Sequence, residues 1–145
     1  MSQVRFQVLY GPASLLPQRM APVAGGDWYS WRLITANNRD LGRSAVSVVS
    51  YQLARRAVLQ LRLVVRRLVQ HSTNDPVTGR WGWRFDLDGV PVAASGRWYE
   101  RDHDARLGAA KFLTLVPEAE LIEGVVTLHD RRAPHTLRLP AGGTR

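Results

Sequence analysis

The histidines and carboxylates of this chain are the first candidates for catalytic or metal-binding chemistry. His103 stands between Asp102 and Asp104 and close to Glu100, so this segment could supply a general base or the ligands of a metal ion. The same residue types are common where helices begin, because acidic side chains there accept hydrogen bonds from free N–H groups and complement the helix dipole. This second use needs no ligand, and we interpret the segment as the start of a helix.

The other candidates for chemistry are weaker. His129 and His135 flank an expected turn that contains Asp130, and Asp86 and Asp88 are two positions apart at the end of an expected strand. Paired carboxylates can act as acid and base, but a pair beside a turn is usually solvated. The sequence has no Walker loop, no serine-hydrolase motif, no zinc-protease motif and no cysteine. We therefore expect no catalytic residue, no metal, no cofactor and no enzymatic activity.

The composition is that of a globular chain with an uneven distribution of charge. Of its 145 residues, 45% are hydrophobic and 22% are charged, which excludes wholesale disorder and coiled coils. The net charge is +8, and all 20 basic residues except Lys111 are arginine. Residues 1–72 contain ten basic and two acidic residues, whereas residues 73–145 contain ten of each. The positive excess therefore lies in the first half of the chain.

Two observations concern the cellular compartment. The most apolar stretch, residues 57–69, is too short to span a bilayer and includes Arg62, Arg66 and Arg67. The first residues lack the apolar core of a secretory signal, and the absence of cysteine fits a reducing compartment. We expect a cytoplasmic protein without a transmembrane segment.

Two stretches of the chain share an alternating pattern of large apolar residues. In residues 29–33 and 81–85, every second side chain is aromatic or leucine. Alternation with a period of two places these side chains on one face of a strand, with Arg32 and Arg84 on the other face. Each stretch therefore predicts a strand with one buried face.

The same succession of elements surrounds both strands. Residues 4–10 and 69–72 are expected as preceding strands, and the turn signals Asn37-Asn38 and Asp88-Gly89 lead into a further strand. A helix follows each hairpin, with apolar residues at helical spacing. The matching apolar positions are Ala54, Val58, Leu61 and Val65 in the first helix and Ala105, Ala109, Phe112 and Val116 in the second.

These patterns predict an α+β fold of two tandem β-β-β-α repeats, with an antiparallel sheet covered by helices and a C-terminal β-hairpin. We expect a single domain over residues 1–145, with repeats at about 1–68 and 69–120 and the hairpin at 121–140. Residues 11–27 are rich in proline and glycine and are expected to form a surface loop. Two unrelated ββα segments in one small domain are the alternative interpretation.

The repeated stretches resemble a motif of the YegP-like family, a largely uncharacterised family of small bacterial proteins. The motif runs from an aromatic residue and a leucine through Asn-Gly, isoleucine and serine to a second aromatic residue and a helix. The similar positions are Trp31, Leu33, Asn37-Asn38, Leu41 and Ser44 in the first stretch, and Trp83, Phe85, Asp88-Gly89, Val92, Ser95 and Trp98 in the second. The resemblance covers roughly residues 28–117 and implies tandem or dimeric β-β-β-α units, but no activity.

The feature that says most about function is a basic helix expected within residues 51–70. This segment has no acidic residue, and a helical projection places its arginines in an outward stripe, with two leucines in the middle and a core face opposite. The candidate binding residues are Arg55, Arg56, Leu59, Arg62, Leu63, Arg66 and Arg67.

Several uses of this stripe remain open. The arginines can be solvated or paired with acidic residues from the second half of the chain. The stripe can instead bind an acidic protein surface or a second copy of the chain, with Leu59 and Leu63 as apolar anchors. It can also contact nucleic-acid phosphates or lie on a membrane surface. We interpret the protein as a non-enzymatic interaction module, forming a homodimer or binding an acidic protein, with nucleic-acid binding as the alternative function.

Overall fold

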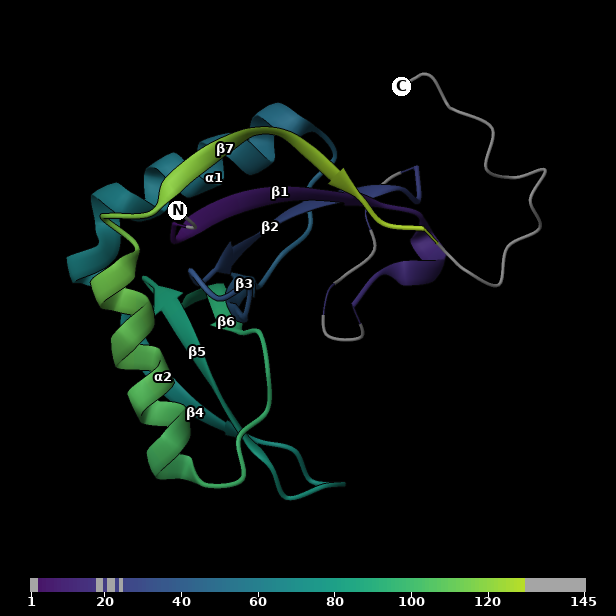
Figure 1. Cartoon of the computed structure of the whole chain (residues 1–145). Coiled ribbons are helices and arrows are strands. Elements are labelled where there is room, and N and C mark those ends of the chain that lie inside the picture. Colours follow the sequence, from purple (N-terminus) through teal and green to yellow (C-terminus); the bar gives the residue numbers. More distant parts are fainter. Residues whose placement is uncertain (1–2, 18–19, 21–22, 24, 130–145) are drawn as a thin grey trace.

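The structure, a computed structural model, describes residues 3–17, 20, 23 and 25–129 (Figure 1). The strands are β1 (Arg5–Gly11), β2 (Trp28–Ile34), β3 (Asp40–Ser44), β4 (Val69–Asn74), β5 (Trp81–Leu87), β6 (Val90–Ser95) and β7 (Glu120–Thr127). The helices are α1 (Tyr51–Val64) between β3 and β4 and α2 (Asp102–Leu115) between β6 and β7, with short 3-10 turns at Ala13–Leu15 and Val65–Arg67.

The seven strands form one sheet in the order β4-β5-β6-β3-β2-β1-β7. Figure 1 shows α1 running alongside β1 and β7, and α2 running alongside β4 and β5. Side chains of both helices share one hydrophobic core with the same face of the sheet. The chain is therefore an α+β protein with α1 and α2 on one face of a mixed sheet, and within the described residues neither α-helix lies on the opposite face.

The C-terminal part differs from the prediction. The expectation of a wholly antiparallel sheet is wrong, because β7 pairs in parallel with β1. A tight turn forces successive strands to be antiparallel, whereas β1 and β7 are joined through nearly the whole chain and can pair in either direction. The second strand of the expected hairpin, residues 136–139, lies outside the described residues.

The hairpin signals in the sequence are confirmed. Asp88 and Gly89 have φ angles of 51° and 82° and form the two-residue connection between β5 and β6. Asn38 has a φ of 64° in the longer loop between β2 and β3. Aspartate, asparagine and glycine tolerate this left-handed conformation better than other residues, which is why the turns are visible in the sequence.

The basic helix is shorter than expected. It begins at a capping residue, since the Ser50 hydroxyl accepts a hydrogen bond from the Leu53 N–H at 3.1 Å. The sequence predicts a helix within 51–70, but α1 ends at Val64, and Val65–Arg67 form a 3-10 turn that leads into β4. Two consecutive β-branched valines weaken the helix at this point. Arg66 and Arg67 therefore do not lie on α1 itself.

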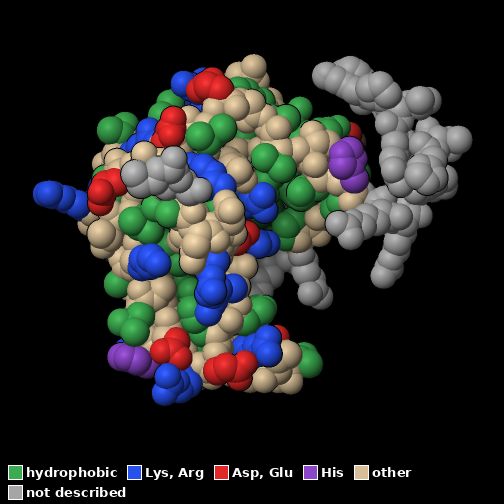
Figure 2. Space-filling model, in the orientation of Figure 1, with side chains coloured by type: hydrophobic (Ala, Val, Ile, Leu, Met, Phe, Trp, Pro, Cys, Tyr) green, Lys and Arg blue, Asp and Glu red, His purple; other side chains and the backbone are tan. Residues whose placement is uncertain are grey.

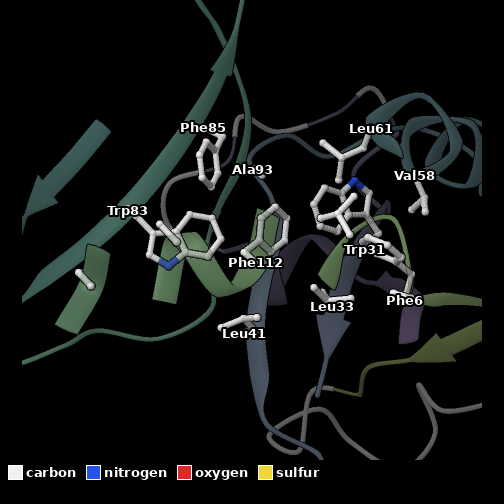
Figure 3. Packing of buried hydrophobic residues seen from close by; sticks show 14 of the residues in the cluster. Phe6, Trp31, Leu33, Leu41, Val58, Leu61, Trp83, Phe85, Ala93 and Phe112 are labelled. Atoms are coloured by element: carbon white, nitrogen blue, oxygen red, sulfur yellow. The ribbon is translucent and has the colours of Figure 1, made fainter. Parts of the chain in front are cut away.

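Aromatic side chains from α2 and the sheet meet in the centre of the core (Figure 3). Phe112 of α2 lies between Trp31 of β2 and Trp83 of β5, with ring centroids 6.3 and 4.8 Å away. Phe6 of β1 meets Trp31 edge to face at 5.4 Å. The expected core positions are confirmed as buried, except the partly buried Val65: Ala54, Val58, Leu61, Ala105, Ala109, Phe112 and Val116.

Candidate functional site

Two arginines of the predicted stripe form ion pairs with acidic residues from the second half of the chain. Arg55 Nε lies 3.6 Å from Glu123 Oε2 in β7. Arg67 Nη2 lies 2.6 Å from Asp88 Oδ2, in the turn between β5 and β6. The exposed fractions of the four side chains range from 43% for Arg55 to 75% for Glu123, so each pair adds little stability. The pairs nevertheless reduce the positive charge at both edges of the stripe.

Arg62 does not point outward, and the predicted continuous stripe is wrong at this position. Its guanidinium donates a hydrogen bond to the backbone carbonyl oxygen of Ala119, just before β7, and lies 5.8 Å from the centroid of the Phe6 ring. Its Nε atom is buried. The pairing of β7 with β1 brings this backbone against α1, and the sequence pattern of α1 alone contains no sign of it.

The remaining exposed side chains form a smaller surface, which we call the α1 face: Leu53, Arg56 and Leu63 of α1, and Arg66 of the 3-10 turn that follows it. Leu63 is 86% exposed, and Leu59 beside it is half-buried. Arg56 and Arg66 are exposed and form no ion pair with any described residue. Of the predicted binding residues, Arg56, Leu63 and Arg66 are thus exposed and without an ion pair to any described residue, and Leu53, which was not predicted, adds a second exposed leucine.

A shallow groove runs beside the α1 face, between α1 and the β5–β6 hairpin. Its volume is about 140 Å³, and most of its lining is apolar. The lining includes Val46, Ala57, Gln60, Val64, Leu87 and Val92. The groove and the exposed leucines give this side of the molecule apolar surface next to positive charge.

The acidic residues around His103 make ion pairs and hydrogen bonds within the fold. Asp102 Oδ1 accepts a hydrogen bond from Ser72 at 2.8 Å, and its Oδ2 lies 3.0 Å from Arg106. Asp104 pairs with Arg101 at 3.1 Å. Figure 2 shows acidic and basic side chains next to each other at the lower edge, where α2 begins. No group of three potential metal ligands occurs among the described residues, and none of the described helices is long and apolar enough to cross a membrane.

The two carboxylates at the end of β5 do not converge on one site. Asp86 is buried, accepts two hydrogen bonds from Arg84 at 2.8 and 3.2 Å, and lies 3.2 Å from His71. Asp88 is exposed in the turn and pairs with Arg67. The expectation of a solvated pair is therefore wrong for Asp86, because Arg84 on the same strand face satisfies its oxygens.

A site that the sequence pattern did not single out lies on the sheet face without helices. Arg32 of β2 is directly opposite Arg43 of β3 and Gln7 of β1. Arg32 Nε donates to Gln7 Oε1 at 3.1 Å. Arg43 donates to Asp40 Oδ2 at 3.0 Å and to the Gly96 carbonyl oxygen at 3.3 Å. Arg43 thus pairs with this carboxylate, and Arg32 lies directly opposite Arg43 without an ion pair to any described residue.

A cavity of about 280 Å³ covers this arginine pair. Its polar lining consists of Ser30, Arg32, Asp40 and Arg43, and its apolar lining includes Leu9, Leu15, Pro17, Met20, Trp28 and Leu128. Ser30 Oγ, Asp40 Oδ1 and Arg43 Nε are buried without a hydrogen-bond partner in the described part of the chain. Burial raises the pKa of Asp40 above 3.8, against the opposing influence of Arg43 and Arg32. We call this site the sheet-face cavity.

Comparison with known proteins gives a fold but no activity. No protein-family model matches the sequence, and no curated protein matches it. The solution structure of YegP from E. coli, a protein of unknown function, is similar with a TM-score of 0.60 at 10% identity, over 90% of this chain and 98% of that protein. A UPF0339 protein from Shewanella oneidensis is similar with a TM-score of 0.55 at 9% identity, over 89% of this chain and 99% of that one. The YegP-like resemblance in the sequence is thus confirmed in three dimensions: the chain has the fold of these uncharacterised proteins.

Proposed function

We propose that the chain is a non-enzymatic binding module that docks an acidic, partly apolar segment of another protein on the α1 face. The observation that carries this proposal is Leu63, a large apolar side chain that is 86% exposed and lies two turns after Arg56 on the same side of α1, with the exposed Arg66 in the 3-10 turn that follows. Interface centres combine apolar anchors with arginine, and the other charges there are depleted. The α1 face has this composition.

The groove beside α1 supports the same proposal. Binding energy concentrates where an apolar side chain of one partner enters a pocket of the other. A cavity of about 140 Å³ next to the leucines offers such a pocket. The segment 51–70 has no acidic residue, so a partner that carries glutamate or aspartate beside its apolar residues meets no like charge from this segment.

Nucleic-acid binding is the weaker candidate. Contact with phosphates along a strand needs several available cations in a row. Arg55, Arg62 and Arg67 are engaged with Glu123, Ala119 and Asp88, which leaves Arg56 and Arg66 on this side. An exposed leucine also contributes nothing to a phosphate contact. Nucleic-acid binding is therefore an outcome of the test and not the proposed function.

The proposal is tested by titrating the labelled protein with a helical peptide of leucine and glutamate and following backbone amide signals by NMR. We expect saturable changes at Leu53, Arg56 and Leu63, and no saturation with the same peptide in which lysine replaces glutamate. Arg56→Glu with Arg66→Glu should weaken binding by about tenfold or more, as expected for the loss of two charge contacts. The control is Arg101→Glu with Arg106→Glu, which changes the net charge equally at the start of α2. It also breaks the ion pairs with Asp104 and Asp102, but it lies away from the α1 face and should leave binding unchanged.

Other outcomes reject the proposal in distinguishable ways. Equal weakening by the control pair would show that net charge alone attracts the peptide. Retardation of DNA or RNA together with no peptide binding would favour the nucleic-acid function, with log K falling by about 0.9 per phosphate contact for each log unit of salt. A concentration-dependent dimer in sedimentation that Leu63→Asp converts to a monomer would identify a second copy as the partner.

We further propose that the chain consists of two duplicated β-β-β-α units within one domain, at about 1–68 and 69–120. The element order β-β-β-α occurs twice in succession, and the third strands of the two units, β3 and β6, pair at the centre of the sheet, which supports this proposal. The equivalent tryptophans Trp31 and Trp83 both contact Phe112. A cytoplasmic location stays a prediction from the sequence.

A further inference from the structure

We propose that the sheet-face cavity binds a small organic anion, a carboxylate with a short apolar tail. This site lies on the opposite side of the sheet from α1, so it is independent of the proposed docking of an acidic segment. The cavity is cationic where β2 meets β3 and apolar where β2 meets the residues that precede it. A ligand that fills the cavity must therefore have an anionic group at one end and an apolar group at the other.

The cationic end has an unbalanced pair of arginines. Arg32 and Arg43 are Cα partners on neighbouring antiparallel strands, and like charges directly opposite each other repel. Asp40 pairs with Arg43, whereas among the described residues the hydrogen-bond partner of Arg32 is the neutral amide of Gln7. The charged residues that line the cavity are Arg32, Arg43 and Asp40. One further negative charge placed between the guanidiniums would balance the site, which indicates a monoanionic head group.

Unsatisfied donors define what the head group must accept. Arg43 Nε and Ser30 Oγ are buried next to the cavity and lack hydrogen-bond partners among the described residues. A buried donor without a partner costs free energy, and native structures rarely leave one unpaired. Ser30 stands two positions before Arg32 on the same strand face, diagonal to Arg43. A carboxylate between them can accept from both the N–H and the hydroxyl.

The apolar end defines the tail of the ligand. Trp28 stands two positions before Ser30 on the same face of β2, and Leu9 of β1 lies opposite Ser30. The indole of Trp28 lies over Gly11, where an added Cβ would be 2.7 Å from the ring, and its Nε1 donates to the Pro12 carbonyl oxygen at 2.8 Å. The polar atom of the indole is thus already satisfied, so the surface left for a ligand is apolar. A short hydrocarbon chain or ring fits this surface.

The β5–β6 hairpin has an arginine, Arg84, at the position equivalent to Arg32, but its charge is neutralised within the fold. Arg84 matches Arg32 in the aligned sequence stretches, but its neighbour Asp86 accepts both of its hydrogen bonds. The residue opposite Arg84 on β6 is Ala94, whereas the residue opposite Arg32 on β3 is Arg43. Arg84 is therefore a matched control, an arginine on the same sheet face whose charge is already neutralised.

The experiment is an NMR titration of the full chain with hexanoate, compared with acetate, hexanol and hexylamine. We expect hexanoate to cause saturable changes at the Trp28 indole N–H and the Ser30 and Arg43 amides, with an affinity about tenfold above that of acetate. Hexanol and hexylamine should cause no saturable change in the same concentration range. Arg32→Gln and Arg43→Gln should each weaken hexanoate binding by about tenfold, whereas Arg84→Gln should have no effect.

The result that overturns the proposal needs no variant. If hexanoate produces no saturable change in the wild-type chain, or if hexylamine binds as well as hexanoate, the cavity is not an anion site. Equal loss of binding in Arg84→Gln would also reject it, because the ligand would then respond to the charge of the whole sheet face. Arg43→Gln removes the ion-pair partner of Asp40 and can destabilise the fold. Arg32→Gln is the safer variant, since the structure gives Arg32 one hydrogen bond, to Gln7.

Discussion

Arg62 in α1 donates a hydrogen bond to the backbone carbonyl oxygen of Ala119, so a residue predicted to bind a partner instead joins the helix to the start of β7. A charged donor to a backbone oxygen contributes roughly 1.5–3 kcal/mol, and the guanidinium also lies 5.8 Å from the centroid of the Phe6 ring. We predict that Arg62→Gln lowers the free energy of unfolding by about 1–3 kcal/mol in urea denaturation.

The control for this prediction is Arg66→Gln. Arg66 is exposed and has no ion-pair partner among the residues that the structure describes, so its loss should change stability by less than about 0.5 kcal/mol. Similar stabilities for the two variants would mean that Arg62 is solvated like the others, and it would return to the set of candidate binding residues.

Gly42 of β3 is predicted to tolerate no larger side chain. A Cβ at this position would lie 2.7 Å from the ring of Phe112 and 2.8 Å from the ring of Trp83. Inserting carbon into a packed core typically costs about 1–3 kcal/mol. We expect Gly42→Ala to destabilise the protein by this amount in thermal or urea unfolding.

A double-mutant cycle separates steric conflict from other causes. Phe112→Leu removes ring atoms that the new methyl group would meet, so Gly42→Ala should cost less in the Phe112→Leu background than in the wild type. Costs that simply add in the double mutant would show that the two residues do not conflict.

The sequence predicted the parts of the fold that local patterns determine. Alternation around Trp31 and Trp83 indicated which side chains of each strand enter the core shared with the helices, because a shift of one residue would turn them to the other face of the sheet. The burial of Trp28 and Ser30 on the other face of β2 was not visible in this pattern. The Asp88-Gly89 turn was visible because few residues adopt positive φ. These signals depend only on neighbours along the chain, and a single sequence contains them in full.

The parts that the sequence did not predict depend on contacts between distant segments. Arg62 has the same spacing as its exposed neighbours, and only the parallel pairing of β7 with β1 places Ala119 beside it. The sheet-face cavity depends on the register that sets Arg32 opposite Arg43, with a shift in pairing between Asp40 and Gly42. The alternation around Arg32 indicated its strand face, but not which residue would lie across from it.

Asp40 is predicted to make stability depend on pH in the direction opposite to most aspartates. Burial raises its pKa above 3.8 in the folded state, so the folded chain binds this proton more tightly than the unfolded chain. Its contribution to stability is fully present below the unfolded pKa and is lost as the pH rises through the folded pKa. We therefore expect Asp40→Asn, which cannot ionise, to gain stability relative to the wild type as the pH rises from about 3 to 7.

The measurement is urea unfolding of both proteins across this range. The other carboxylates titrate in both chains, so their effects cancel in the difference between the two free energies of unfolding. A difference that stays constant with pH, or that favours the wild type more as the pH rises, would show that Arg43 and Arg32 outweigh the burial of Asp40.

Gly108 lies inside α2, where glycine is ordinarily about 1 kcal/mol less favourable than alanine. Here the order should reverse, because a Cβ would lie 2.3 Å from the hydroxyl oxygen of Tyr99 and 2.8 Å from its ring carbon Cζ, and this tyrosine is buried. We predict that Gly108→Ala lowers the melting temperature and that Tyr99→Phe, which removes the hydroxyl, recovers part of the loss. Ala110→Gly, at an exposed position of the same helix, measures the effect of helix propensity on stability alone. A Gly108→Ala variant that is more stable than the wild type would mean that Tyr99 moves away at no cost, so that helix propensity alone decides the outcome.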